Sequence, residues 1–203
     1  MRTISIEEFQ TRIEAGYETR FIEFKSGFIW NDDDNTWLKE KVIRAVLALT
    51  NTRGGGEIIL GIREGEGHQI ILEGMTRVQV ASFEDYDTVA GYINSFSSNP
   101  IGIEILKCFY KNVYFIILKI IEFKDYPTLC NKDGKTSKIL VKNDIYVRSL
   151  RAPFGSIKAG PSEIKEIIMQ AADKERQGLD LRGYTKARDL AESVNFVERL
   201  KDL

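Results

Sequence analysis

The stretch from residue 37 to residue 62 constrains the fold of this chain more than any other part of its sequence. Its apolar residues first recur at the spacing of one helix face, which predicts a helix over 37–50. Arg53 to Gly56 interrupts that period, and the apolar run EIILGI over 57–62 then predicts a buried strand. The order of helix, glycine turn and buried strand leaves no room for a linker and points to a tightly packed unit.

The remaining apolar runs predict further elements of both kinds. Their spacing changes between the 3.6-residue period of helices and the two-residue period of strands. We expect helices over 4–14, 84–96 and from Pro161 onward, strands at 21–24, 69–72, 101–109, 113–123, 139–141 and 145–149, and a tail helix over 185–200. On the helix from Pro161 the residues expected to face inward are Ile164, Ile167, Ile168 and Ala171.

These elements predict the α+β class, with a mixed β-sheet covered by helices and a C-terminal helical tail. A chain of 203 residues is near the upper end of one ordinary domain. We therefore expect one domain over 1–176, followed by a linker and a C-terminal helix over 177–203.

The composition excludes several classes of protein. The chain has 29 Lys and Arg against 30 Asp and Glu, which excludes a uniformly basic coat for nucleic acid but not a local basic patch. The longest apolar stretch, 113–121, is interrupted by Lys119 and is too short to span a membrane. The N-terminus has no signal-peptide core, and Cys108 and Cys130 lack the spacing of a zinc site or a disulfide framework. We expect a cytoplasmic protein that does not associate with membranes.

His68 is the only histidine, and this limits the available chemistry. Nucleophile systems of the Ser-His-Asp and Cys-His kinds need a histidine base, and zinc sites usually need two or more histidines. His68 lies in a polar turn, where a solvated side chain is the simpler interpretation. Any chemistry must therefore depend on carboxylates, lysine or backbone amides.

Glu23 and Lys25 stand two residues apart on a predicted strand, so their side chains share one face. Such a pair can help to hold a divalent metal or neutralise a phosphodiester, whereas a simple salt bridge on a solvated face is the alternative. Glu18 precedes Glu23 by five residues. On one continuous strand it would point the other way, so it joins the pair only from a preceding turn.

The string from Asn51 to Gly56 is the most unusual local sequence. Its three glycines permit positive φ angles and a close approach by a phosphate, and their exposed amides can bind an anion. Asn51, Gly54, Gly55 and Gly56 are therefore candidate cofactor-binding residues. The alternative is a tight connection with a glycine cap. The pattern fits neither a P-loop nor a Rossmann fingerprint.

Charge is unevenly distributed along the chain. Residues 57–87 hold seven acids and two bases, whereas residues 132–158 hold seven bases and two acids. Two solvated faces would explain this, and so would a site that grips phosphates. Tyr146 and Arg148 share a strand face, and an aromatic ring beside a guanidinium can stack a base and bind a phosphate. The candidate nucleic-acid-binding residues are Lys132, Lys135, Lys138, Lys142, Tyr146, Arg148 and Arg151.

Three strings taken together resemble one family. ETRFIEFK over 18–25 fits the pattern E-x4-E-F-K, and AVLALTNTRGGGEIILGI over 45–62 fits A-x-A-N-T-x-G-G followed by a strand that ends in G-[VI]. DIYVRS over 144–149, followed by a helix at Pro161, fits a third block. In this order they resemble the Schlafen AlbA-type domain family, over about residues 14–170.

The resemblance implies an α+β core, often as two units that face each other across a nucleic-acid groove. Only one unit is visible in this chain, so a second copy would come from a dimer partner. Some Schlafen proteins are metal-dependent endoribonucleases with three carboxylates, which match Glu18, Glu23 and Glu64 here. Relatives often carry G-V-D-D where this chain has Gly-Ile-Arg63-Glu64, so Arg63 replaces the first acid and Glu64 falls at the second.

On this hypothesis Glu18, Glu23 and Glu64 hold Mg²⁺ or Mn²⁺, and Lys25 offsets the charge that builds up on the scissile phosphate. The basic run from Lys132 onward would hold structured RNA such as tRNA, with RNA favoured over DNA. One alternative is a DNA-, RNA- or nucleotide-binding module without catalysis, in a regulatory or phage-defence system. Another is an assembly scaffold that joins larger complexes through the 185–200 helix.

Overall fold

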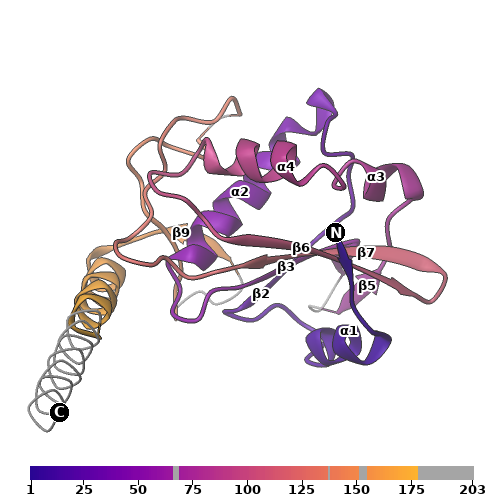
Figure 1. Ribbon diagram of the computed structural model, residues 1–203, viewed down its shortest axis with the longest axis horizontal. Coiled ribbons are helices and arrows are strands. Elements are labelled where there is room, and N and C mark those ends of the chain that lie inside the picture. The colour runs from indigo at the N-terminus through magenta and orange to yellow at the C-terminus, as the bar shows by residue number, and fades with distance from the viewer. Residues whose placement is uncertain (66–68, 137, 151–154, 178–203) are drawn as a thin grey trace, which may run out of the picture.

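The computed structural model describes residues 1–65, 69–136, 138–150 and 155–177. Its centre is a five-stranded sheet in the order β1-β6-β7-β3-β2 (Figure 1). The strands are β1 (Arg2–Thr3), β6 (Ile103–Tyr110), β7 (Val113–Ile120), β3 (Gly56–Leu60) and β2 (Ile22–Lys25). β2 pairs parallel with β3 and β1 parallel with β6, whereas the two pairings of β7 are antiparallel. The predicted mixed sheet of an α+β fold is confirmed.

Helices cover both faces of this sheet. Figure 1 shows α2 (Thr36–Thr50) and α4 (Tyr86–Asn94) on one face and α1 (Ile6–Ile13) on the other. Alternation along the strands supplies the apolar groups for both sides: Ile58 and Leu60 pack in the core beneath α2, while Ile59 packs with Phe9 of α1. The predicted order of helix, glycine turn and strand is confirmed, and α2 is the crossover between the parallel strands β2 and β3.

Local signals define several element ends. Ser5 and Glu8 form a capping box at the start of α1, and Asp85 caps α4. The β6–β7 hairpin turns at Lys111 and Asn112, whose φ angles are 49° and 65°. Two successive positive φ angles match the twist that a two-residue hairpin needs. The predicted hairpin is therefore confirmed, with slightly shorter strands.

Gly61 breaks the predicted 57–62 strand, so the expectation of one continuous strand is wrong. Its φ angle is +98°. The chain leaves the main sheet there, and β4 (Ile62–Glu64) pairs instead with β5 (Ile70–Leu72) in a separate antiparallel pair. The predicted pairing of 69–72 back across the EGEG turn is confirmed.

The predicted strand at 139–141 is also wrong, because that segment makes turns around the buried Leu140. β8 (Tyr146–Arg148) pairs with β9 (Ser156–Lys158), which lies in a polar stretch without a clear period. The short helix α3 (Arg77–Ala81), held by a capping box of Thr76 and Gln79, has too few residues to show a helical period.

The helix predicted from Pro161 is present over 161–177, but only one of its predicted inward residues is nearly fully buried. Ile167 is 3% exposed, whereas Ile164 is 38% and Ile168 60% exposed. Ile167 packs with Phe123 and Val147 of the body. Polar pairs add to this contact: Gln170 donates to Glu122 at 2.6 Å, and Arg53 pairs with Asp173 at 2.9 Å.

The predicted linker and the 185–200 helix lie outside the described residues. Within the part of the chain that the structure describes, no helix is both long and apolar enough to cross a membrane.

Candidate functional site

Glu18 and Glu23 meet because of a turn that the sequence left open. Thr19 and Ile22 exchange backbone hydrogen bonds, with N–O distances of 3.0 and 3.4 Å, just before β2 begins. This turn brings Glu18 back along the strand, where one of its carboxylate oxygens accepts a hydrogen bond from the Phe24 amide at 2.9 Å. Both carboxylates are nearly buried, at 4% and 6% exposure. Glu18 therefore reaches the face of Glu23 from outside the strand.

Two cations hold the Glu23 carboxylate. Lys25 Nζ lies 2.5 Å from Glu23 Oε1 and 3.7 Å from Glu18 Oε1. Arg148, which is 1% exposed, donates from Nη1 to Glu23 Oε2 and from Nη2 to the Thr19 carbonyl at 2.5 Å. The shared face of Glu23 and Lys25 is confirmed, but the carboxylate is buried and the ammonium is only partly exposed, so the pair does not lie on an open solvated surface.

The environment of Glu18 favours its neutral form. Burial raises its pKa from the ordinary 4.5 to about 7, and the negative charges of Glu23 and Glu64 act in the same direction. The Lys25 ammonium and the Phe24 amide oppose the shift only in part. A carboxyl group that exchanges its proton near neutral pH, next to a lysine, is a common feature of reactive sites.

A pocket of about 440 Å³ opens onto this cluster. Glu18 and Lys25 contribute to it from the β2 region, and Glu64 contributes from β4. The complete lining is Glu18, Phe24, Lys25, Ser26, Trp37, Leu38, Lys41, Ile62, Arg63 and Glu64. Three of the four predicted catalytic residues, Glu18, Lys25 and Glu64, therefore line one pocket. The fourth, Glu23, does not line it and joins the cluster through its ion pair with Lys25.

Two residues of α2 complete the rim, and the sequence analysis did not single them out. Trp37 is 47% exposed, and Lys41 Nζ lies 3.5 Å from the centre of its indole ring. Burial, followed by the positive charge of Lys25, lowers the pKa of Lys41. Their spacing of four residues places them on one face of a helix, which is the one signal that could have found them.

The predicted anion-binding loop is filled by the protein's own groups. Asn51 is buried, and its side chain donates to the Thr128 and Tyr146 carbonyls at 2.8 and 3.1 Å. The Gly54 amide donates to the Glu122 carboxylate at 2.8 Å. A side chain at Gly55 would place its Cβ 2.2 Å from the Ile120 carbonyl oxygen. Gly56 also packs tightly, against Leu49 and Phe21. The arrangement supports the tight-connection alternative.

The predicted basic run divides into an exposed part and a buried part. We call residues 132–142, apart from 137, the lysine loop; its exposed cations are Lys132, Lys135, Lys138 and Lys142. Tyr146 and Arg148, in contrast, are 2% and 1% exposed, so neither ring nor guanidinium presents a face to a nucleotide. Arg151 lies outside the described residues.

α2 connects the lysine loop to the pocket. The buried Glu40 accepts hydrogen bonds from the backbone amides of Lys135 and Thr136, at 2.5 and 3.2 Å. Glu40 is adjacent in sequence to Lys41, which lines the pocket. One helix therefore holds the lysine loop and also lines the pocket.

A comparison with known families agrees with this arrangement of segments. The family model described as Schlafen, AlbA_2 matches residues 18–151, from Glu18 through the lysine loop to the end of β8 and beyond. The chain belongs to the Schlafen AlbA_2 family. No curated protein matches it.

Two solved structures are similar at low identity. The DIP2311 protein from Corynebacterium diphtheriae is 16% identical with a TM-score of 0.47; the match covers 79% of this chain but only 28% of that protein. The N-terminal domain of an ATP-dependent DNA helicase RecG-related protein from Nitrosomonas europaea is also 16% identical, with a TM-score of 0.40. That match covers 77% of this chain and 89% of the domain.

The Mg²⁺ or Mn²⁺ site that the Schlafen resemblance implies is not preformed. Among the described residues, no group of three or more His, Cys, Asp and Glu side chains is arranged to hold a metal ion. Glu23 gives the reason, since Lys25 pairs with one of its oxygens and Arg148 with the other. The carboxylates of this Schlafen AlbA_2 chain, as they are arranged, do not fit a divalent ion, and the metal stays a prediction.

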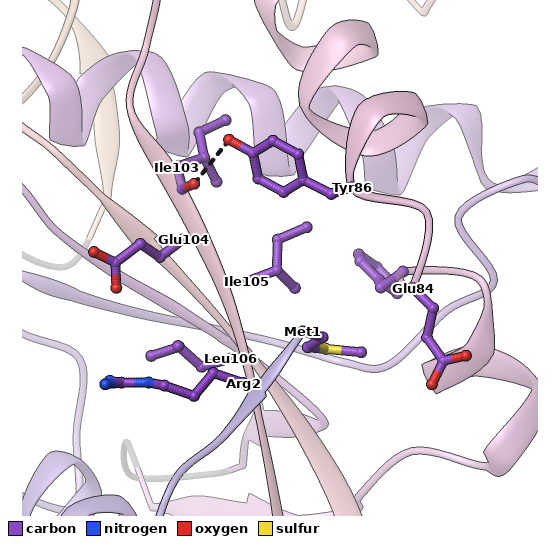
Figure 2. A pocket seen from close by; sticks show the side chains of 9 residues that line it. Met1, Arg2, Glu84, Tyr86, Ile103, Glu104, Ile105 and Leu106 are labelled. Atoms are coloured by element: carbon purple, nitrogen blue, oxygen red, sulfur yellow. Dashed lines mark hydrogen bonds between the residues drawn. The ribbon is translucent and has the colours of Figure 1, made fainter.

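A second pocket of about 420 Å³ lies at the opposite edge of the sheet. Figure 2 shows Met1, Ile105 and Tyr86 gathered there, with the Tyr86 hydroxyl donating to the Ile103 carbonyl at 3.1 Å. The carboxylates of Glu84 and Glu104 point away from its centre (Figure 2). The pocket beside β2, in contrast, brings opposite charges together around the buried carboxyl group of Glu18. It is the candidate site of this Schlafen AlbA_2 protein.

Proposed function

We propose that this protein binds nucleic acid across the lysine loop and the pocket beside β2. The observation that carries the proposal is that α2 supports both: Glu40 holds the loop and Lys41 lines the pocket. A cationic loop and a pocket with a buried carboxyl, both contacted by α2, fit a phosphate backbone, since the lysines attract phosphates without reading sequence. Membership of the Schlafen AlbA_2 family supports the same function.

RNA is the favoured partner in this proposal. Basic loops recognise structured RNA mainly by shape and by phosphate contacts, which needs no reading of base edges in a groove. The lysine loop provides charge of this kind, with four exposed lysines within eleven residues of chain.

Replacing Lys135, Lys138 and Lys142 with Gln is expected to weaken RNA binding at least tenfold at about 0.1 M salt. Each lost phosphate contact should also lower the slope of log affinity against log salt by about 0.7 to 0.9. Fluorescence anisotropy with labelled tRNA and a matched DNA duplex, at several salt concentrations, measures both quantities and the RNA preference.

The matched control replaces three exposed lysines elsewhere, Lys111, Lys119 and Lys124, and has the same change in net charge. If both triple variants lose equal affinity, net charge alone drives binding and the lysine loop is not the contact surface.

Phosphodiester hydrolysis is a second candidate, favoured by the protonation of Glu18 near neutral pH beside Lys25. In such a reaction the oxygen of water forms a bond to phosphorus, and the bond from phosphorus to the leaving sugar oxygen breaks. The proton that the water loses goes to the carboxylate, which can return it to the leaving oxygen. Lys25 would offset the added negative charge.

Glu18→Gln is the suitable variant for testing cleavage, because the amide oxygen can still accept from the Phe24 amide. Glu23→Ala would instead leave the buried Arg148 without its carboxylate. We expect cleavage of labelled tRNA or rRNA fragments to fall at least a hundredfold in Glu18→Gln while binding is retained.

The same assay includes Mn²⁺ and EDTA arms. Cleavage that EDTA abolishes would mean that the carboxylates rearrange to take the metal. If the protein binds RNA but cleaves it in no arm, the hypothesis of a non-catalytic binding module is supported. If it does neither, the scaffold hypothesis is the one that remains.

A further inference from the structure

Trp37 is a large aromatic side chain near the pocket that is not part of the hydrophobic core. The chain has two tryptophans. Trp30 is 2% exposed and packs among Phe28, Phe83 and Tyr92, whereas Trp37 is 47% exposed in the first turn of α2. An indole ring at the rim of a charged pocket exposes a large apolar surface to water, which is the property of a contact surface rather than of a core residue.

One cation lies over the ring, and two more line the pocket that the ring borders. Lys41 Nζ lies 3.5 Å from the ring centre, and Lys25 and Arg63 line the same pocket. Lys41 Nζ lies over one face of the indole, and Trp37 is still 47% exposed, which leaves apolar surface for a planar group to pack against. A flat aromatic platform next to several ammonium and guanidinium groups matches the two halves of a nucleotide, a base and a phosphate.

We propose that the pocket binds an unpaired nucleotide, with its base stacked on Trp37 and its phosphate held by Lys41 and Lys25. This inference rests on the proposed nucleic-acid binding and deepens it, because it names the form of nucleic acid that the pocket selects. Aromatic stacking recognises bases of any identity, so the site selects a strand with an accessible base rather than a sequence.

The geometry requires the base to be unpaired. In a duplex, neighbouring base pairs cover both faces of each base, and an aromatic side chain reaches a face only when the base is in a loop, a bulge or a single strand. The phosphate backbone of a duplex would still bind the lysine loop. The lysine loop thus provides affinity for any nucleic acid, and the pocket with Trp37 provides selectivity for unpaired nucleotides.

Trp37→Ala is expected to weaken binding of a short single-stranded RNA about 5- to 100-fold. Binding of a fully paired RNA duplex should change less than about twofold, because its contacts are with phosphates. The affinity of Trp37→Phe for single-stranded RNA should lie between those of the wild type and of Trp37→Ala, because this variant keeps a smaller ring. Tyr126→Ala is the matched control, since Tyr126 is 56% exposed and does not line the pocket. The exposure of Trp37 makes a folding defect an improbable cause, and circular dichroism of each variant checks this.

Tryptophan fluorescence provides a second readout that does not depend on affinity for long RNA. We expect a nucleoside 5′-monophosphate to quench the emission of the wild type, and ribose 5-phosphate and inorganic phosphate to leave it unchanged. The quenching should disappear in Trp37→Phe, which retains the buried Trp30 as an internal reference.

The outcomes separate the two proposals. Loss of single-strand binding and of quenching in the Trp37 variants, with duplex binding intact, supports both. Wild-type affinity of Trp37→Ala for single strands overturns the stacking role while leaving nucleic-acid binding in place. A wild-type protein that binds no RNA and shows no quenching by the nucleotide overturns both.

Discussion

Arg148→Met is expected to destabilise the protein by about 3 kcal/mol or more, because the buried Glu23 carboxylate then keeps, among the described residues, only its ion pair with Lys25. The variant also removes the guanidinium that donates to the Thr19 carbonyl in the turn before β2. For a chain of this length such a loss lowers the midpoint of thermal unfolding by roughly 10 °C. Differential scanning calorimetry and urea denaturation measure the two quantities.

A second substitution tests whether the unpaired charge is the cause. Arg148→Met combined with Glu23→Gln removes the buried negative charge, so the double variant should recover part of the lost stability. Arg53→Met serves as the surface control, since its pair with Asp173 is exposed on both sides and its removal should leave the midpoint nearly unchanged.

If Arg148→Met matches Arg53→Met in stability but loses RNA affinity, the guanidinium contacts nucleic acid, as its sequence position first suggested. If it loses stability and the double variant recovers it, Arg148 is the internal counter-ion of Glu23.

Glu18→Gln should make the protein more stable at alkaline pH and leave it unchanged at acid pH. The pKa of Glu18 is about 7 in the folded protein and lies above its ordinary value of 4.5. A raised pKa gives a contribution to stability that is fully present below about pH 4.5 and is lost as the pH rises through about 7. The loss, on the order of 3 kcal/mol by pH 8, is absent in the variant because the amide has no proton to release.

Urea denaturation at about pH 4.5 and pH 8 checks this, with the wild type and the variant expected to differ only at the higher pH. Glu8→Gln provides a control of opposite sign. A hydrogen bond from the Ser5 amide lowers the pKa of Glu8, so that group stabilises at neutral pH and loses its effect as the pH falls. If the free energies of unfolding of Glu18→Gln and the wild type differ by the same amount at every pH, the pKa of Glu18 is not shifted by folding.

The sequence was sufficient for the elements whose hydrophobic period is strong. α2 and the β6–β7 hairpin have uninterrupted patterns, and the structure confirms them with ends shifted by a few residues. The break at Gly61 could not be read in the same way, because the apolar residues continue on both sides of it. β1 is only two residues long and joins the sheet through β6, about one hundred residues further along the chain.

The candidate site was predictable only in part, for a comparable reason. Glu23 and Lys25 are two residues apart, and their proximity follows from strand geometry alone. Arg148 reaches Glu23 across 125 residues of sequence, and no local spacing encodes that contact. An arginine beside an aromatic residue on a strand is typical of a nucleic-acid surface, but tertiary burial gives Arg148 a different partner. Exposure of Trp37 likewise depends on which face of α2 the β-sheet covers.

The position of Glu64 has an unusual origin, since a backbone torsion angle sets it rather than a side-chain contact. Gly61, with its φ angle of +98°, turns the chain out of the main sheet three residues before Glu64 reaches the pocket. A Cβ there would lie 3.1 Å from Phe115 and from the backbone of Gly74, and L-residues with side chains rarely adopt such an angle. The direction in which Glu64 enters the pocket thus depends on Gly61. The charge of the pocket therefore relies on a residue that has no functional group of its own.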